Sequence, residues 1–143
     1  MKSHEDAVKR IVRYLIGTKD KGLILAPSAD IVLEAFEDAD FAGLWNEKDP
    51  QDPTCVKSRT GYLIQLRGSP VVWFSKLQTL VAVSTMEVEY VALSMCMQEL
   101  NPLRRLLKEL QGVLHSESSV TRTASTVFED NMGAICYSIS LFS

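Results

Sequence analysis

The sequence predicts an α/β domain in which a mixed sheet, an antiparallel run of three strands plus one parallel strand, is covered by helices. Apolar residues recur every three or four positions in residues 5–16 and 84–112, which is typical of amphipathic helices. Residues 58–76 hold two β-rich runs around a tight turn, and a helix and a further strand follow them. The chain has 143 residues, 46% hydrophobic and 23% charged, which suits one globular domain with at most a short appendage.

The first half of the chain begins with the helix expected over residues 5–16. A strand is expected over residues 31–36, because this stretch is short, apolar and rich in β-branched residues. It leads directly into an acidic cluster at 37–40. Residues 58–76 are expected to form a hairpin whose turn lies at 67–70, where glycine and proline are found.

The second half begins with a long helix, expected over residues 84–101. Pro102 is expected to start or kink a second helical stretch, because proline lacks the backbone N–H that a helix interior needs. That stretch covers residues 103–112 and ends at Gly112, a plausible helix cap. A polar linker at 115–125, a short strand at 126–130 and a helix at 131–142 are expected to follow.

Charge and cysteine content exclude several classes of protein. The net charge is −3, with 15 basic against 18 acidic residues, so a strongly basic nucleic-acid-binding protein is excluded. Three widely spaced cysteines predict reduced thiols rather than a disulfide framework or a zinc site. No apolar run reaches the roughly 20 residues that span a bilayer, and the charged N-terminus lacks the apolar part of a secretory signal. We therefore expect an intracellular protein without a membrane partner.

Three carboxylates stand where the predicted elements can bring them together. Asp38 follows the first strand, Asp130 ends the last strand, and Glu89 lies in the first turns of the helix between them. Sites in open α/β sheets gather at strand ends and helix starts, and converging carboxylates suit Mg²⁺ or Mn²⁺. Asp38 and Asp40 share one face of a regular strand, so either one is a ligand and the other a neighbour, or the pair caps the turn into Gly43.

Two glutamates of the long helix have different expected roles. Ser84 and Glu87 match a capping box, in which the glutamate reaches back to the helix N-terminus. Glu89 instead lies on the apolar stripe, where a lone charge is costly unless it has a partner such as a metal ion. The alternative for Glu89 is a glutamate at the rim of the core that reaches to solvent.

Four blocks of the sequence carry a family resemblance. They are SHEDAVKRIVRYLIGTKDKGL (3–23), EDADFAG (37–43), KSRTGYLIQLRGSPVVWFSKLQTLVAVSTMEVEYVAL (57–93) and EDNMGAI (129–135). In this order and with these gaps, the chain resembles the ribonuclease H domain of copia-type LTR-retrotransposon polyproteins, with the tail of the reverse transcriptase before it. The family patterns are RYL-x-GT, SDADWAG, S-x-S-x-x-GY followed by ISW-x-SK-x-Q and ALS-x-x-EAEY-x-AL, and DN-x-x-AI.

The resemblance implies a ribonuclease H-like fold and two-metal hydrolysis of RNA in RNA–DNA hybrids during reverse transcription. It assigns the catalytic and metal-binding carboxylates to Asp38, Glu89 and Asp130, with two Mg²⁺ (or Mn²⁺) ions expected. It divides the chain into a reverse transcriptase tail at 1–26 and a ribonuclease H-like domain at 27–143. The implied partners are the hybrid and the reverse transcriptase of the same polyprotein, in a cytoplasmic particle or the nucleus.

The sequence departs from the family pattern at three places. Glu37 stands where a serine is usual, and Phe41 where a tryptophan is usual. The family continues past the DN motif to a histidine-containing segment and a fourth carboxylate, whereas this chain continues as ICYSISLFS. We therefore expect a domain that is incomplete at its C-terminus and has little hydrolytic activity by itself. Two alternatives stay open: a degenerate, non-catalytic remnant that acts as a nucleic-acid-binding or connector module, and a metal-free α/β interaction module.

Candidate contacts to the hybrid are polar side chains near the carboxylates, which would meet phosphates and ribose hydroxyls. These candidates are Arg59, Ser75, Lys76, Gln78 and Asn131. Trp45 and Trp73 are candidates for stacking on nucleotides, although a strand tryptophan such as Trp73 is more often part of the core.

Overall fold

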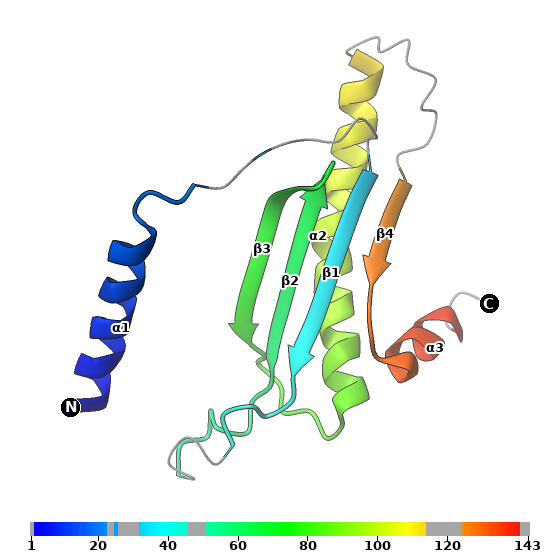
Figure 1. The fold of residues 1–143 in the computed structure, drawn as a ribbon. Helices are drawn as coiled ribbons and strands as arrows, with labels where there is room; N and C mark the ends of the chain where they lie inside the picture. The colour runs from blue at the N-terminus through cyan, green and yellow to red at the C-terminus, as the bar shows by residue number, and fades with distance from the viewer. Residues whose placement is uncertain (1, 23–24, 26–31, 46–50, 114–123, 141–143) are drawn as a thin grey trace.

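The computed structural model describes residues 2–22, 25, 32–45, 51–113 and 124–140. Its elements in chain order are α1 (Lys2–Thr18), β1 (Val32–Asp40), β2 (Arg59–Leu66), β3 (Ser69–Leu77), α2 (Thr85–Val113), β4 (Ala124–Phe128) and α3 (Met132–Ser140) (Figure 1). The order of elements is the predicted one. The polar linker at 115–125, the domain boundary after residue 26 and the last residues of the C-terminal helix lie wholly or largely outside the described residues.

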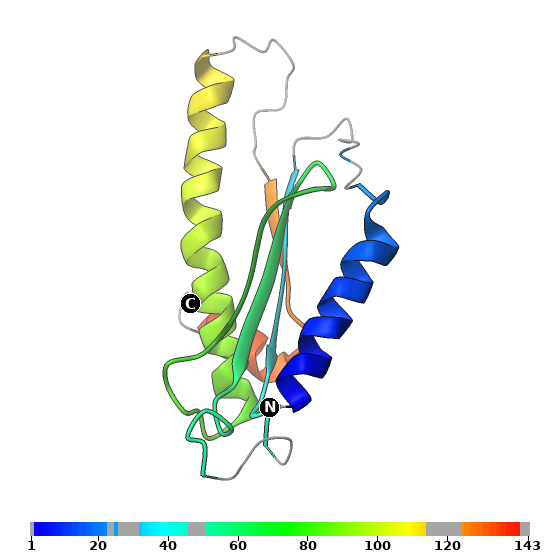
Figure 2. The same cartoon turned by 90° about the vertical axis from the view of Figure 1, so that its left-hand side faces the viewer.

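The four strands form one mixed sheet in the order β3-β2-β1-β4. β1 pairs with β2 and β2 with β3 in antiparallel fashion, whereas β1 pairs with β4 in parallel. A parallel pair needs a long crossover, which α2 provides on one face of the sheet (Figure 2). The predicted fold class, a ribonuclease H-like mixed sheet covered by helices, is confirmed.

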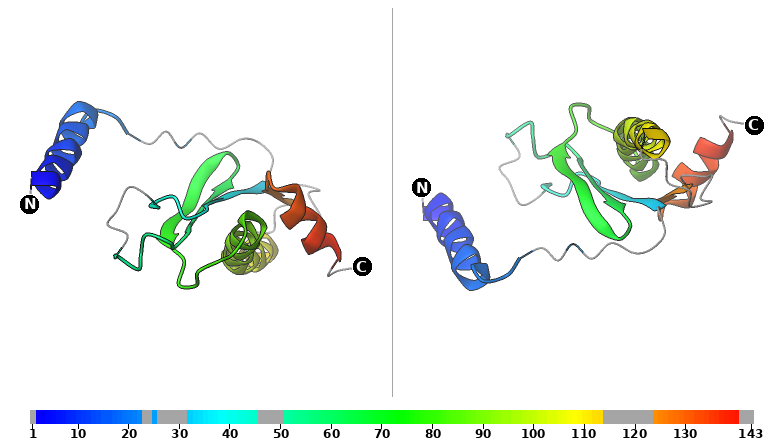
Figure 3. Two further views of the ribbon diagram at one scale, coloured as in Figure 1. Left: turned by 90° about the horizontal axis from the view of Figure 1, so that it is seen from below. Right: turned by 90° about the horizontal axis from the view of Figure 1, so that it is seen from above.

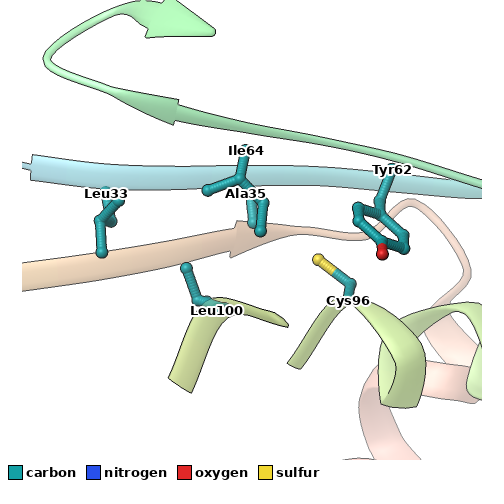
Figure 4. Close-up of a cluster of buried hydrophobic side chains, with 6 residues drawn as sticks. All are labelled: Leu33, Ala35, Tyr62, Ile64, Cys96 and Leu100. Carbon is teal, nitrogen blue, oxygen red and sulfur yellow. The ribbon is translucent and has the colours of Figure 1, made fainter. Parts of the chain in front are cut away.

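The core lies between α2 and the two central strands. Side chains that alternate along β1 and β2 point toward one face of α2, as strand and helix periodicity require (Figure 4). The buried cluster consists of Leu33, Ala35, Tyr62, Ile64, Cys96 and Leu100. Tyr62 also stacks on Phe74 of β3 with ring centroids 5.0 Å apart, so the helix-covered face continues to the edge strand.

Several predicted boundaries are wrong. The last strand runs over Ala124–Phe128 rather than 126–130, so it ends two residues before Asp130. The hairpin turn is tighter than the predicted 67–70, because only Arg67 and Gly68 lie between β2 and β3, both with positive φ (55° and 76°). Such angles at both central residues are those of a type I′ turn, whose twist matches the flanking strands. α2 neither stops nor restarts at Pro102, because Leu100 before it and Leu103 after it pack on the same core.

The first strand is longer than predicted and carries the acidic cluster within it. β1 reaches Asp40 rather than ending at residue 36, because it pairs with β2 along its whole length, from Leu33 opposite Leu66 to Asp40 opposite Arg59. The acidic residues therefore alternate between the two faces of the sheet instead of sharing one loop.

The N-terminal helix α1 lies apart from the sheet (Figures 1 and 3). Its residues 4–17 are all exposed, including the apolar stripe with Ile11 and Leu15. Among the described helices, none is both long enough and apolar enough to cross a membrane.

Candidate metal centre

Asp38, Glu89 and Asp130 come together at one end of the sheet. Each offers a carboxylate oxygen, and these oxygens lie within 4.8 Å of one another. β1 and β4 are parallel neighbours, so their C-terminal ends lie side by side, and α2 begins at the same end (Figure 1). The predicted convergence is confirmed, whereas metal binding and catalysis by these residues stay predictions.

Glu89 is the buried member of the cluster, with 7% of its surface exposed. It lies one turn before Ala92 and two turns before Cys96 on the face of α2 that packs against the sheet. The backbone N–H of Ala39 donates a hydrogen bond to its carboxylate, while its Oε2 is buried without a hydrogen-bond partner among the described residues. Burial raises the pKa of Glu89, and the nearby charges of Asp38 and Asp130 raise this pKa further.

Glu87 has the predicted capping role. Its backbone N–H donates to Oγ of Ser84 (3.1 Å), and its Oε2 accepts a hydrogen bond from the backbone N–H of Val83 (2.8 Å). In the usual capping box this glutamate would accept from the backbone N–H of Ser84, whereas here Glu87 accepts from the residue before Ser84. Glu87 is exposed and points to the helix terminus, so it belongs to α2 rather than to the carboxylate cluster.

Asp38 and Asp130 are exposed, so the cluster is open to solvent on their side. Asp40 is not part of this group. Its carboxylate lies against Gly43 so closely that a Cβ at this position would collide with it. Asp40 therefore belongs to the tight turn after β1, where Ala42 has a positive φ of 48°.

A second group of carboxylates was missed by the sequence reasoning. Oxygens of Glu37, Glu89 and Glu129 also lie within 4.8 Å of one another. Glu37 is 7% exposed and faces α2, two residues after Ala35 on the same side of β1. The strand alternation Leu33, Ala35, Glu37 was a signal for this placement.

Glu129 is half-buried and anchored by its own turn. Its Oε1 accepts a hydrogen bond from the backbone N–H of Asn131 (2.7 Å), and its Oε2 is buried without a partner among the described residues. Burial raises the pKa of Glu129, with a smaller contribution from Asp130, although backbone hydrogen bonds oppose the shift.

The predicted nucleic-acid contacts divide into two groups. Ser75 and Lys76 are exposed and Arg59 is half-buried at the same end of the sheet as the carboxylates. Asp38 pairs with Gly61, which pairs with Ser75, so Ser75 stands two strands away from Asp38, or about 10 Å.

Gln78 and Asn131 have structural contacts instead. Gln78 is 6% exposed, and its amide nitrogen donates to Oγ1 of Thr60 and to the carbonyl of Val88, both at 3.0 Å. This side chain joins the hairpin to α2 and has no exposed donor. Asn131 caps α3, since its Oδ1 accepts a hydrogen bond from the backbone N–H of Ala134 (3.1 Å).

Both tryptophans are exposed. Trp73 is 70% exposed, so the expectation that it belongs to the core is wrong. It lies on the face of the edge strand β3 opposite to Phe74, which packs on the core. α2 covers one face of the sheet (Figure 2), and alternation with Phe74 along β3 puts Trp73 on the other face. Trp45 is 53% exposed in the turn after β1.

Comparison with known proteins gives consistent relatives. The chain is 40% identical over 134 residues to the retrovirus-related Pol polyprotein from transposon TNT 1-94 of Nicotiana tabacum, a match covering 94% of the chain and 9% of that protein. It is 36% identical over 131 residues to the Pol polyprotein from transposon RE2 of Arabidopsis thaliana, with 92% and 8% covered. It is also 40% identical over 97 residues to the secreted RxLR effector protein 161 of Plasmopara viticola, with 68% and 63% covered. The chain thus spans less than a tenth of the length of these polyproteins. No family model matches the chain, and no solved structure matches it.

Proposed function

This chain belongs to the retrovirus-related Pol polyproteins of copia-type transposons, of which it is a segment, and on that premise we propose that it hydrolyses the RNA strand of RNA–DNA hybrids with divalent cations. The observation that carries the proposal is the meeting of Asp38, Glu89 and Asp130 within 4.8 Å. These residues occupy the positions that the family motifs assign to catalytic carboxylates.

The cluster has the chemistry of a divalent-cation site. Carboxylate oxygens are the ligands that Mg²⁺ and Mn²⁺ prefer, and three residues here each offer one such oxygen, all within 4.8 Å of one another. Oε2 of Glu89 is buried without a described hydrogen-bond partner, which is costly unless a cation satisfies it. A bound ion would activate a water molecule and neutralise charge on the scissile phosphate.

The three residues contribute differently to the proposed reaction. Burial and the hydrogen bond from the Ala39 N–H hold the Glu89 carboxylate in place, so it would be the buried ligand of a bound ion. Asp38 and Asp130 are exposed and open the site toward a substrate phosphate. We expect the protein to act by holding and orienting these groups, because preorganised charge is a large part of catalysis of this kind.

The hybrid is proposed to lie along the end of the sheet. Lys76 lies one register row and Arg59 two rows beyond the row that joins Asp38 to Ser75, so a duplex phosphate held by either cation would lie near the carboxylates. Hydroxyl and amide groups such as those of Ser75 and Asn131 would meet ribose hydroxyls, which distinguish RNA from DNA. α1 contributes no residue to the described core, which supports a division of the chain near residue 26.

The test is turnover of a labelled RNA–DNA hybrid by the purified chain in Mg²⁺ and in Mn²⁺. Asp38→Asn is the matched blank, because it keeps the size of an exposed side chain and removes one ligand charge. Because the fourth carboxylate of the family pattern has no counterpart here, we expect only slow cleavage, confined to the RNA strand, dependent on the ion and lost in the variant. Binding of the hybrid without cleavage in either ion would support a non-catalytic nucleic-acid-binding module instead.

A further inference from the structure

Glu37 is buried in an environment that offers its charge no partner. It is 7% exposed, and neither carboxylate oxygen has a hydrogen-bond partner within the described part of the chain. An isolated carboxylate in such a place is strongly unfavourable, because desolvation is not repaid by any contact. The described residues alone therefore do not satisfy it.

A repeated tripeptide brings Glu37 next to Glu129. The sequence reads Phe-Glu-Asp at 36–38 and again at 128–130. β1 and β4 are parallel, with Phe36 in register with Phe128, so the two copies run side by side. The phenylalanines stack on each other on the uncovered face, and the glutamates that follow them turn toward α2.

The helix adds a third carboxylate to this pair. Glu89 projects from α2, and the oxygens of Glu37, Glu89 and Glu129 lie within 4.8 Å of one another. Each of the three residues has a buried oxygen without a hydrogen-bond partner among the described residues. None of them forms an ion pair with a described basic side chain. Three carboxylates this close repel one another unless a cation lies between them.

We propose that Glu37, Glu89 and Glu129 form a second, buried site for a divalent cation of the Mg²⁺ or Mn²⁺ type. The site goes beyond the proposed hydrolysis, because Glu37 and Glu129 do not belong to the proposed catalytic set. An all-carboxylate set favours hard divalent cations over soft ions, and all three residues offer an oxygen within 4.8 Å of the others. Glu89 is shared by both groups, so this ion would also fix the orientation of Glu89.

The two sites can be separated by substitution, because their unshared ligands differ. The starting variant carries Asp38→Asn and Asp130→Asn, which removes both exposed ligands and leaves the buried group intact. Mn²⁺ is the probe, measured by calorimetric titration and by electron paramagnetic resonance of the bound ion. We expect the double variant to retain Mn²⁺ binding. Adding Glu37→Gln should weaken Mn²⁺ binding by about tenfold or more. Loss of a group that only orients a metal ligand already has an effect of this size, and Glu37 is proposed to be a ligand itself.

Melting temperatures of the same variants show whether a loss of Mn²⁺ binding reflects a loss of folding. Glu37→Gln keeps the shape of the side chain and removes one of three repelling charges, so the metal-free variant should melt at or above the temperature of its parent. Mn²⁺ should raise the melting temperature of the parent and not that of the variant. Glu129→Gln is the second variant and should act in the same direction.

Two results would overturn the inference. One is a double variant that binds no Mn²⁺, and the other is Mn²⁺ binding that persists after Glu37→Gln and Glu129→Gln. Neither result bears on the proposed hydrolysis, which is read from hybrid turnover with Asp38 intact.

Discussion

Phe36 of β1 and Phe128 of β4 stack with their ring centroids 4.7 Å apart and their planes 9° apart. Each phenylalanine is followed directly by a Glu-Asp pair, at 37–38 and at 129–130, and the two strands are parallel neighbours in the sheet. Each ring is only partly exposed despite lying on the uncovered face of the sheet. The stack therefore holds β1 and β4 in the register on which both carboxylate groups depend.

We expect Phe36→Ala and Phe128→Ala each to destabilise the fold and to be coupled. A double-mutant cycle in urea unfolding should give a coupling of about 0.5–1.5 kcal/mol, which is typical of an aromatic pair. Trp73→Ala, at an unstacked exposed aromatic on the same face, is the control and should show no coupling to Phe128. Additive effects of the two phenylalanine substitutions would contradict this role.

Glu87→Gln and Glu89→Gln should separate capping from cation binding. Glu87→Gln should leave Mn²⁺ affinity nearly unchanged, because Glu87 faces the N-terminus of α2 and Val83. Glu89→Gln should weaken Mn²⁺ binding clearly, because Glu89 is common to both carboxylate groups. Calorimetric titration measures both. Equal losses would show that the helix face was wrongly assigned.

The metal-free protein should lose stability as the pH rises above the ordinary pKa of a glutamate, 4.5. The folded state raises the pKa of Glu89, first through burial and then through Asp38 and Asp130. The folded protein thus holds this proton more tightly than the unfolded chain does, so the contribution is present below pH 4.5 and is lost as pH passes the raised pKa. Glu129 acts in the same direction.

Urea unfolding across this pH range, with a chelator present, measures the effect. Glu89→Gln should flatten the dependence, because the amide does not titrate. An unchanged slope in this variant would refute the assignment.

Lys76→Ala should affect hybrid binding, whereas Gln78→Ala, two residues away, should affect the stability of the fold. Lys76 is exposed, so its loss should weaken hybrid binding and reduce the salt dependence by about one unit of slope while stability is kept. Gln78 is buried and donates to Thr60 and Val88, so its loss should cost about 1–3 kcal/mol of stability. Fluorescence anisotropy with a labelled hybrid and thermal melting distinguish the two. The reverse pattern would remove Lys76 from the proposed surface.

The cysteines should differ sharply in reactivity. Cys96 is buried in the core, and burial raises its pKa to about 11, so little thiolate forms near neutral pH. Cys136 is exposed in α3, whereas Cys55 is buried. Mass spectrometry after alkylation of the native protein at pH 8 should find Cys136 modified and Cys96 protected. Fast modification of Cys96 would show that α2 separates from the sheet.

Periodicity predicts the order of elements, because strand and helix faces are local properties of the sequence. The meeting of Asp38, Glu89 and Asp130 is predicted only when strand ends, the helix face and the family motifs are taken together. The continuity of α2 through Pro102 is not local. The cost of the missing backbone N–H is offset by packing of residues on both sides of the proline against one core, which only the tertiary structure provides.

The exposure of Trp73 and the burial of Glu37 also depend on the sheet as a whole. Alternation along a strand shows which residues share a face, but it does not show which face a helix will cover. Trp73 lies on the uncovered face of the edge strand β3. Glu37 lies on the covered face beside Leu33 and Ala35, in a position that polarity alone assigns to solvent.

The chain connectivity of the sheet has a kinetic consequence. β2 and β3 are joined by the two-residue turn Arg67–Gly68, so their pairing closes a very short loop. The partners Phe36 and Phe128 lie roughly 90 residues apart, and pairing of this kind is slow because the entropy of closing a long loop must be lost first. We expect the hairpin to form early and β4 to join the sheet last, so that the acidic residues meet only in the final step of folding. Native-state hydrogen exchange should accordingly show β4 and α3 opening while β2 and β3 stay protected.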